Sequence, residues 1–141
     1  MLLRTHIALL IGSFVSRIIT LLNLGAGITW AGEIALRIDP NFLSFVRSRL
    51  DEIIIVTGTN GKTTTTSMIA HILKKQNTSL IHNDSGANLI NGIVGTFITQ
   101  FSQTKTDKKC MGLFEVDEAE LVNIVPILCP NNIVILNLFR D

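Results

Sequence analysis

The chain has 141 residues, of which 47% are hydrophobic and 16% charged, so it can fold around a core and is not a disordered tail. Its 12 basic and 11 acidic residues nearly cancel, and no basic run is interleaved with aromatic residues. This balance argues against nucleic acid as a partner.

The first 50 residues are predicted to be a helical lead-in, distinct from a domain formed by residues 51–141. A helix is expected over residues 3–23, and a glycine-rich link follows it. Asp39 and Pro40 then offer an N-cap and a first-turn proline for a helix that ends near Leu50.

The apolar character of the lead-in raises the question of membrane contact. Arg17 and the run Gly25-Ala26-Gly27 divide it, so neither part reaches the roughly 20 residues that a bilayer span requires. We therefore expect a buried or amphipathic packing helix, with Trp30 as a hydrophobic anchor that docks the lead-in on the domain. Peripheral attachment to a membrane stays open as the alternative.

Apolar strands alternate with helices after residue 50. Strands are predicted at residues 53–57, 79–82, 110–116 and 132–138, and helices at residues 63–76, 88–101 and 118–125. Strands that are nearly all apolar indicate an α/β fold, in which helices cover both faces of a parallel sheet and ligands bind at the carboxyl ends of its strands. Because the sequence stops directly after the last predicted strand, we expect the chain to be a fragment of a longer protein.

A glycine-rich turn joins the first of these strands to the helix after it, and it reads Gly58-Thr59-Asn60-Gly61-Lys62-Thr63-Thr64. Glycines let backbone N–H groups turn inward, and the start of a helix adds its positive dipole end, so such a turn suits phosphate. Lys62 would meet the β- and γ-phosphates, and the Thr63 hydroxyl would bind Mg²⁺. The turn departs from the general phosphate-binding pattern, which has glycine where this chain has Val56. We predict a nucleoside triphosphate with Mg²⁺ as the ligand.

Acidic residues follow the third predicted strand. Glu115 lies where this strand ends, so its carboxylate can face the phosphates and bind Mg²⁺ through oxygen. The alternative is that Glu115, Asp117 and Glu118 only cap the next helix, whose first turn favours acids. We favour the metal for Glu115 and leave both interpretations open for Asp117 and Glu118.

A polar loop over residues 83–88 follows the second predicted strand. Asn83 and Asn88, together with Asp117, are candidates to contact a substrate beside the γ-phosphate, although the composition of the loop is equally that of a turn and helix cap. Cys110 and Cys129 have no metal-ligand spacing, and we expect two buried thiols in a reducing compartment, the cytoplasm.

Three motifs resemble those of the Mur ligase superfamily, in the same order: residues 56–64, 114–116 and 136–141. The glycine of its ATP-binding loop stands where Gly58 does, and Glu115 matches its strand-end glutamate for Mg²⁺. The resemblance implies that residues 51–141 are the N-terminal part of a Mur ligase central ATP-binding domain, with Lys62 and Glu115 as catalytic residues and ATP and Mg²⁺ as cofactors.

Within the superfamily, residues 82–88, 115–118 and 38–41 are similar to the ligase subunit that amidates lipid II. This likeness implies that ATP activates the α-carboxyl of D-glutamate as an acyl phosphate, which ammonia from a glutaminase subunit, GatD, converts to D-isoglutamine. It also implies peptidoglycan synthesis at the cytoplasmic face of the membrane, and a fragment that is inactive alone. The alternatives are another Mur ligase or folylpolyglutamate-synthase-like enzyme that adds an amino acid, and a non-catalytic ATP-binding module.

Overall fold

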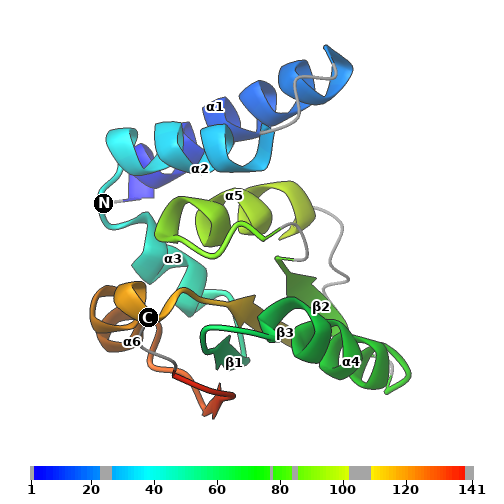
Figure 1. The fold of residues 1–141 in the computed structure, drawn as a ribbon. Coiled ribbons are helices and arrows are strands. Elements are labelled where there is room, and N and C mark those ends of the chain that lie inside the picture. Colours follow the sequence, from blue (N-terminus) through cyan, green and yellow to red (C-terminus); the bar gives the residue numbers. More distant parts are fainter. Residues whose placement is uncertain (1, 23–26, 77, 84–85, 102–108, 139–141) are drawn as a thin grey trace.

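Within the described residues, the sheet has four strands, all parallel (Figure 1). They are β1 (Glu52–Thr57), β2 (Ser79–His82), β3 (Cys110–Glu115) and β4 (Asn132–Ile135), in the spatial order β2-β3-β1-β4. This computed structural model describes residues 2–22, 27–76, 78–83, 86–101 and 109–138. The parallel sheet with helices between its strands confirms the predicted α/β fold.

Alternate residues of β1 face two different hydrophobic cores. Ile53 and Ile55 are buried in the larger core, which the sheet shares with α3 (Phe42–Ser48), α5 (Ile90–Phe101) and α6 (Leu121–Leu128). Ile54 and Val56 belong to the smaller core beneath α4 (Lys62–Lys74). Because side chains alternate along a strand, α4 covers one face of the sheet and the other three helices cover the opposite face.

The lead-in forms a helical layer on the outer side of α5 (Figure 1). α1 (Leu2–Leu21) packs against α2 (Gly27–Ile38), and both contact α5. The third lead-in helix, α3, places Phe42 and Val46 in the larger core of the sheet. The lead-in and the strands therefore share one core. The buried Asp39 joins the layers, because its carboxylate accepts hydrogen bonds from the Thr5 hydroxyl at 2.6 Å and the Asn41 backbone N–H at 3.0 Å.

The glycine-rich link expected after residue 23 is wrong from Gly27 on, because Gly27–Ile38 is a helix, and the part of the link before Gly27 lies outside the described residues. Glycines of this segment lie at the contact between helices rather than in a turn. A Cβ atom on Gly32 would lie 1.8 Å from the carbonyl oxygen of Asn91, and one on Gly95 would lie 1.8 Å from that of Ile28. Glycine lowers helix propensity, but here its lack of a side chain lets the backbones of α2 and α5 touch.

We expected a buried or amphipathic packing helix and a docked tryptophan; α1 does pack against α2, but its large apolar side chains are exposed. In α1 the small residues Ala8 and Ser16 are buried, whereas Leu10 and Phe14 are 71% and 64% exposed. Trp30 is 57% exposed, so the expectation that it anchors the lead-in is wrong. No helix in the described part of the chain has the length and hydropathy of a membrane span.

The last elements are close to the predicted ones, with shifted bounds. The helix expected at residues 118–125 begins as a short 3₁₀ turn, η1 (Glu118–Glu120), and continues as α6. β4 lies at one edge of the sheet and ends at Ile135, three residues before the predicted end at residue 138. Cys110 is buried in β3 but Cys129 is exposed after α6, so the expectation of two buried thiols is wrong for Cys129.

Candidate functional site

The turn between β1 and α4 requires glycine at its first position. Gly58 has φ of +133°, a backbone conformation that side chains disfavour, and a Cβ atom there would lie 2.8 Å from the carbonyl oxygen of Asn137. This contact exists because the chain after β4 runs beside the turn. The close approach explains why a glycine stands at position 58 rather than at Val56, which is buried within β1.

Asn137 fixes the shape of this turn, a role that sequence reasoning missed. Its carbonyl oxygen accepts a hydrogen bond from the Thr59 N–H at 2.9 Å, and its Oδ1 accepts one from the Asn60 N–H, also at 2.9 Å. Its Nδ2 donates to the Asn60 carbonyl at 3.2 Å. The available signal was the polar residue directly after a run of apolar strand residues, at the carboxyl end of β4.

The N-terminus of α4 opens on the turn. Gly61 precedes the helix in a left-handed conformation, and no side chain caps it. The first-turn N–H groups of a helix have no partner within the helix, and together with the dipole they attract anions. Lys62 begins the helix, is 12% exposed, and donates from Nζ to the carbonyl oxygen of Gly58. The ammonium group therefore lies at the turn.

Thr63 and Glu115 come together across the turn. The Thr63 hydroxyl donates to Glu115 Oε1 at 3.2 Å, although the residues are 52 positions apart. Glu115 ends β3 in register with Val56 of β1 and is 3% exposed. Its second oxygen, Oε2, is buried and has no hydrogen-bond partner among the described residues. A buried carboxylate oxygen without a donor is costly, so this atom fits a cation ligand.

The donor set suits Mg²⁺ held jointly with a nucleotide. A hydroxyl and one carboxylate are oxygen ligands, and Mg²⁺ is commonly held by one or two carboxylates plus substrate phosphates. Within the described ranges, three or more His, Cys, Asp or Glu side chains do not gather at any one place. The residues that would hold the ion are therefore Thr63 and Glu115, with the phosphates supplying further oxygens.

Asn83 positions Glu115 instead of facing a substrate. It is 1% exposed, and its Oδ1 accepts a hydrogen bond from the Glu115 N–H at 2.7 Å. Its Nδ2 donates to the carbonyl oxygens of Glu115 at 2.8 Å and Ala87 at 2.9 Å. Because both ends of the amide are committed to the backbone, this geometry disagrees with the expectation that Asn83 contacts substrate.

Asn88 and Asp117 lie next to one another at the carboxyl edge of the sheet. The carbonyl oxygen of Asn88 accepts a hydrogen bond from the Asp117 N–H at 3.0 Å. The Asp117 carboxylate caps η1, where it accepts from the Ala119 N–H at 3.0 Å. The helix-cap interpretation thus holds for Asp117, and Asn88 remains a candidate for substrate contact.

Glu118, for which the sequence left metal binding and helix capping open, pairs with Lys62 in the structure. Its carboxylate lies 3.5 Å from Lys62 Nζ and accepts a hydrogen bond from the Thr59 hydroxyl at 3.2 Å. A hydrogen bond from its own backbone N–H, and then the positive charge of Lys62, hold the pKa of the Glu118 carboxyl below its usual value. The Glu118 carboxylate is therefore paired with the Lys62 ammonium group, which a bound phosphate would otherwise contact.

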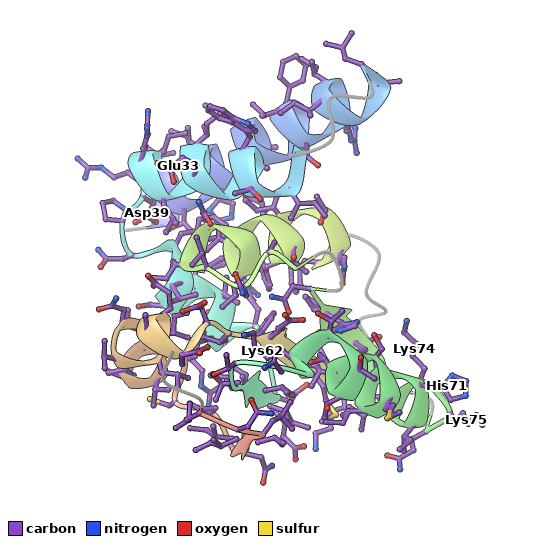
Figure 2. The ribbon with its side chains drawn as sticks, viewed as in Figure 1. Glu33, Asp39, Lys62, His71, Lys74 and Lys75 are labelled. Atoms are coloured by element: carbon purple, nitrogen blue, oxygen red, sulfur yellow. The ribbon has the colours of Figure 1, made fainter. Side chains whose placement is uncertain are left out.

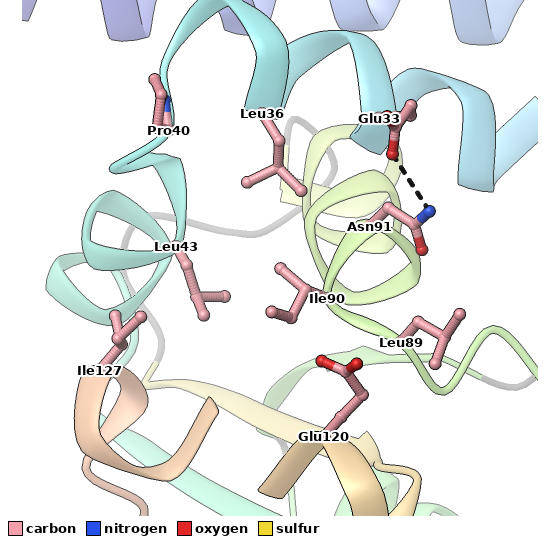
Figure 3. Close-up of a pocket in the computed structure, with 9 residues that line it drawn as sticks. All are labelled: Glu33, Leu36, Pro40, Leu43, Leu89, Ile90, Asn91, Glu120 and Ile127. Carbon is pink, nitrogen blue, oxygen red and sulfur yellow. Dashed lines mark hydrogen bonds between the residues drawn. The ribbon is translucent and has the colours of Figure 1, made fainter. Parts of the chain in front are cut away.

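Among the described residues, hollows lie both beside the glycine-rich turn and away from it. One, of about 750 Å³, runs along α4 from Thr63 and Thr64 to Ile72, so it opens beside the turn. The other, of about 410 Å³, lies between α2, α3, α5 and α6 (Figure 3). Glu33 and Asn91 form a 3.4 Å hydrogen bond on one wall, and Glu120 stands on the opposite side. None of the residues of the glycine-rich turn lines this second pocket.

The chain is similar to known proteins over the residues that form the site. Residues 56–138 match the Mur ligase middle domain family. Two curated relatives are named "Lipid II isoglutaminyl synthase (glutamine-hydrolyzing) subunit MurT". The one from Streptococcus pneumoniae is 43% identical over 139 residues, which are 99% of this chain and 30% of the relative. The one from Staphylococcus aureus (strain COL) is 38% identical over 110 residues, which are 78% of this chain and 24% of the relative. The chain thus spans less than a third of the length of these relatives.

A solved structure shares the fold. It is the UDP-N-acetylmuramoylalanyl-D-glutamyl-2,6-diaminopimelate–D-alanyl-D-alanyl ligase from Acinetobacter baumannii, with a TM-score of 0.58 at 21% sequence identity. The match covers 77% of this chain and 23% of that protein.

Proposed function

The chain belongs to the Mur ligase family, and from that premise we propose that it is the nucleotide-binding part of an ATP-dependent ligase of peptidoglycan synthesis. The proposed reaction amidates D-glutamate of lipid II to D-isoglutamine, with ammonia from a GatD-like glutaminase subunit. The names of the curated relatives support this choice. Because ATP is the proposed cosubstrate, the reaction would take place in the cytoplasm.

One observation carries the nucleotide-binding part of the proposal. The Thr63 hydroxyl and the Glu115 carboxylate meet at 3.2 Å beside Lys62, and Glu115 Oε2 is buried without a donor among the described residues. A hydroxyl, a carboxylate and an ammonium at an uncapped helix N-terminus complement a triphosphate and its cation. If Glu115 had only a structural role, its buried oxygen without a donor would destabilise the fold and nothing would compensate for this.

In the proposed reaction, a carboxylate oxygen of the acceptor attacks the γ-phosphorus of ATP. The bond from the γ-phosphorus to the bridging oxygen breaks, ADP leaves, and an acyl phosphate forms. The lone pair of ammonia then attacks the acyl carbon, the C–O bond to phosphate breaks, and loss of a proton leaves the amide. ATP, carboxylate and ammonia thus become ADP, phosphate and amide.

The residues of this chain would bind and orient the phosphates in the first step. Lys62 would exchange Gly58 and Glu118 for phosphate oxygens, and the N–H groups of the first turn of α4 would donate to the same group. Thr63 and Glu115 would hold Mg²⁺. When bound, this ion supplies the positive charge that offsets the charge on the phosphate oxygens.

Isothermal titration with ATP and Mg²⁺ tests the nucleotide site. We expect Lys62→Ala to weaken binding by about tenfold or more, because a charged hydrogen bond contributes roughly 1.5–3 kcal/mol. Lys74→Ala is the matched control, since Lys74 is an exposed lysine at the other end of the same helix (Figure 2). Glu115→Gln should remove most of the effect of Mg²⁺ on affinity. The absence of ATP binding by folded wild-type protein would overturn the proposal.

The acceptor is tested separately, with lipid II, ATP and either ammonium or an amino acid supplied to the enzyme and its glutaminase partner. The proposal expects ammonium-dependent ADP formation and transfer of a heavy-oxygen label from the carboxylate to phosphate. Incorporation of an amino acid would identify an amino-acid-adding ligase instead. ATP binding without any ADP formation would identify a non-catalytic module.

A further inference from the structure

α1 packs onto the rest of the molecule through small residues. Thr5, Ala8, Gly12 and Ser16 recur at helical spacing and are buried. A Cβ atom on Gly12 would come within 3.3 Å of the Ala31 carbonyl oxygen of α2, which shows how closely the two helices approach. A surface helix in water ordinarily turns large apolar side chains toward the rest of the protein, at the positions where α1 has these small residues. In α1 the usual arrangement is reversed.

The opposite face of α1 carries its large apolar side chains. We call Leu3, Ile7, Leu10, Ile11, Phe14 and Ile18 the apolar stripe of α1; each is at least 38% exposed. Their spacing of three and four residues places them on one side of the helix. Leu21, at the end of the helix, continues the same side and is 83% exposed. A stripe of this length marks a surface that binds something apolar.

The charges around the stripe are positive. Arg4 and Arg17 are exposed on α1, which contains neither aspartate nor glutamate. In α2 the one acidic residue, Glu33, forms a 3.1 Å ion pair with Arg37. The outer helical layer therefore presents apolar side chains beside arginines and is complementary to an apolar surface with negative charge at its boundary.

We propose that the apolar stripe of α1 docks on the surface of a membrane that contains anionic lipids, with the helix lying in the plane of the interface. Small residues at the helix contacts and large apolar residues outside are the arrangement of helices that face lipid. Arginines beside the stripe would contact lipid phosphates, and the exposed Trp30 of α2 has the amphipathic ring that favours the interface. A protein partner, or a second copy of this chain, is the competing occupant.

This orientation leaves the nucleotide site accessible. α1 and α2 lie on the outer side of α5, and the sheet and α4 lie beyond it (Figure 1). Lys62 is at the sheet, away from the outer helical layer (Figure 2). Membrane contact through α1 is therefore independent of the proposed nucleotide binding, and Lys62→Ala should bind vesicles as the wild type does.

Flotation with lipid vesicles tests the proposal. The wild type is expected to float with vesicles of phosphatidylcholine and phosphatidylglycerol, and more weakly with vesicles of phosphatidylcholine alone. Leu10→Ser and Phe14→Ser should each lower the partition coefficient about tenfold, because each removes a large apolar side chain from the interface. Val122→Ser in α6, at a side chain that is 76% exposed, is the matched control and should leave it unchanged.

Charge is tested by Arg4→Gln and Arg17→Gln, which should each weaken binding to the anionic vesicles about fivefold and leave binding to phosphatidylcholine unchanged. Unchanged circular dichroism and thermal unfolding show that each variant is folded, as expected for exposed positions. Lack of flotation with either vesicle would overturn the proposal. An equal fall of the partition coefficient in Val122→Ser would also overturn it. So would a dimer that dissociates in Phe14→Ser, if the wild type does not bind vesicles.

Discussion

Glu118 and Lys62 form the ion pair at the centre of the candidate site, and they come from distant parts of the sequence. They are 56 positions apart and meet only because the ends of β1 and β3 lie side by side. The pair keeps a positive group at the turn in the absence of phosphate. It also means that a phosphate must displace a carboxylate to reach Lys62, so Glu118 acts on the site through the lysine.

We predict that Glu118→Gln tightens nucleotide binding and gives a pH-dependent loss of stability. The pKa of Glu118 in the folded protein lies below its unfolded value of about 4.5, so the carboxylate stabilises the fold above that pH. This contribution is lost as pH falls through the folded pKa. Urea unfolding should therefore separate wild type and variant at neutral pH and bring them together in acid. A difference that persists unchanged in acid would contradict the assignment.

At the scale of elements, the sequence predicted the strands and turns that depend on a local pattern of residues. Strands near residues 53–57, 79–82 and 110–116 are apolar runs bounded by polar turns, and their positions are confirmed. The glycine turn is also local, because its chemistry lies in consecutive residues. α2 was missed because its glycines were interpreted as a link, although Gly32 fits against Asn91 of α5, some 60 residues away, and Gly27 fits against Ile19 of α1. Asn137 was missed because its partner, Asn60, is 77 positions away.

The α2–α5 contact gives a prediction with a matched control. Gly95→Ala should lower the free energy of unfolding by about 1–3 kcal/mol, because the added methyl would lie 1.8 Å from the Ile28 carbonyl oxygen and backbone must move. Gly12→Ala is the control: its closest contact is the flexible Cδ1 of Ile98 at 2.8 Å, and alanine raises helix propensity by up to about 1 kcal/mol.

Denaturant unfolding followed by circular dichroism measures both variants. The expected order of stability puts Gly95→Ala well below the wild type and Gly12→Ala close to it. Equal stability of Gly95→Ala and the wild type would mean that α2 and α5 do not touch as described. The comparison also separates the effect of helix propensity, common to both variants, from that of backbone contact.

At the scale of the whole molecule, the sequence predicts a division at residue 50, but residues on both sides of this position share one hydrophobic core. Phe42 and Val46 of the lead-in lie in the same core as Ile53 and Phe114 of the sheet. A shared core favours unfolding in a single cooperative step, because separating the lead-in would expose the apolar face of the sheet. Two independent domains would instead unfold in two steps.

The reactivity of the cysteines can show whether the protein unfolds in one step or in two. Cys110 is buried in β3, and burial, followed by the negative charge of Asp51, raises the pKa of its thiol, so the folded protein should protect it from thiol reagents. Exposed Cys129 should react at once, so Cys129→Ser leaves Cys110 as the single probe. We predict that Cys110 becomes reactive at the same denaturant concentration at which helical circular dichroism is lost. Helix loss at a lower concentration, with Cys110 still protected, would show that the lead-in unfolds as a separate unit.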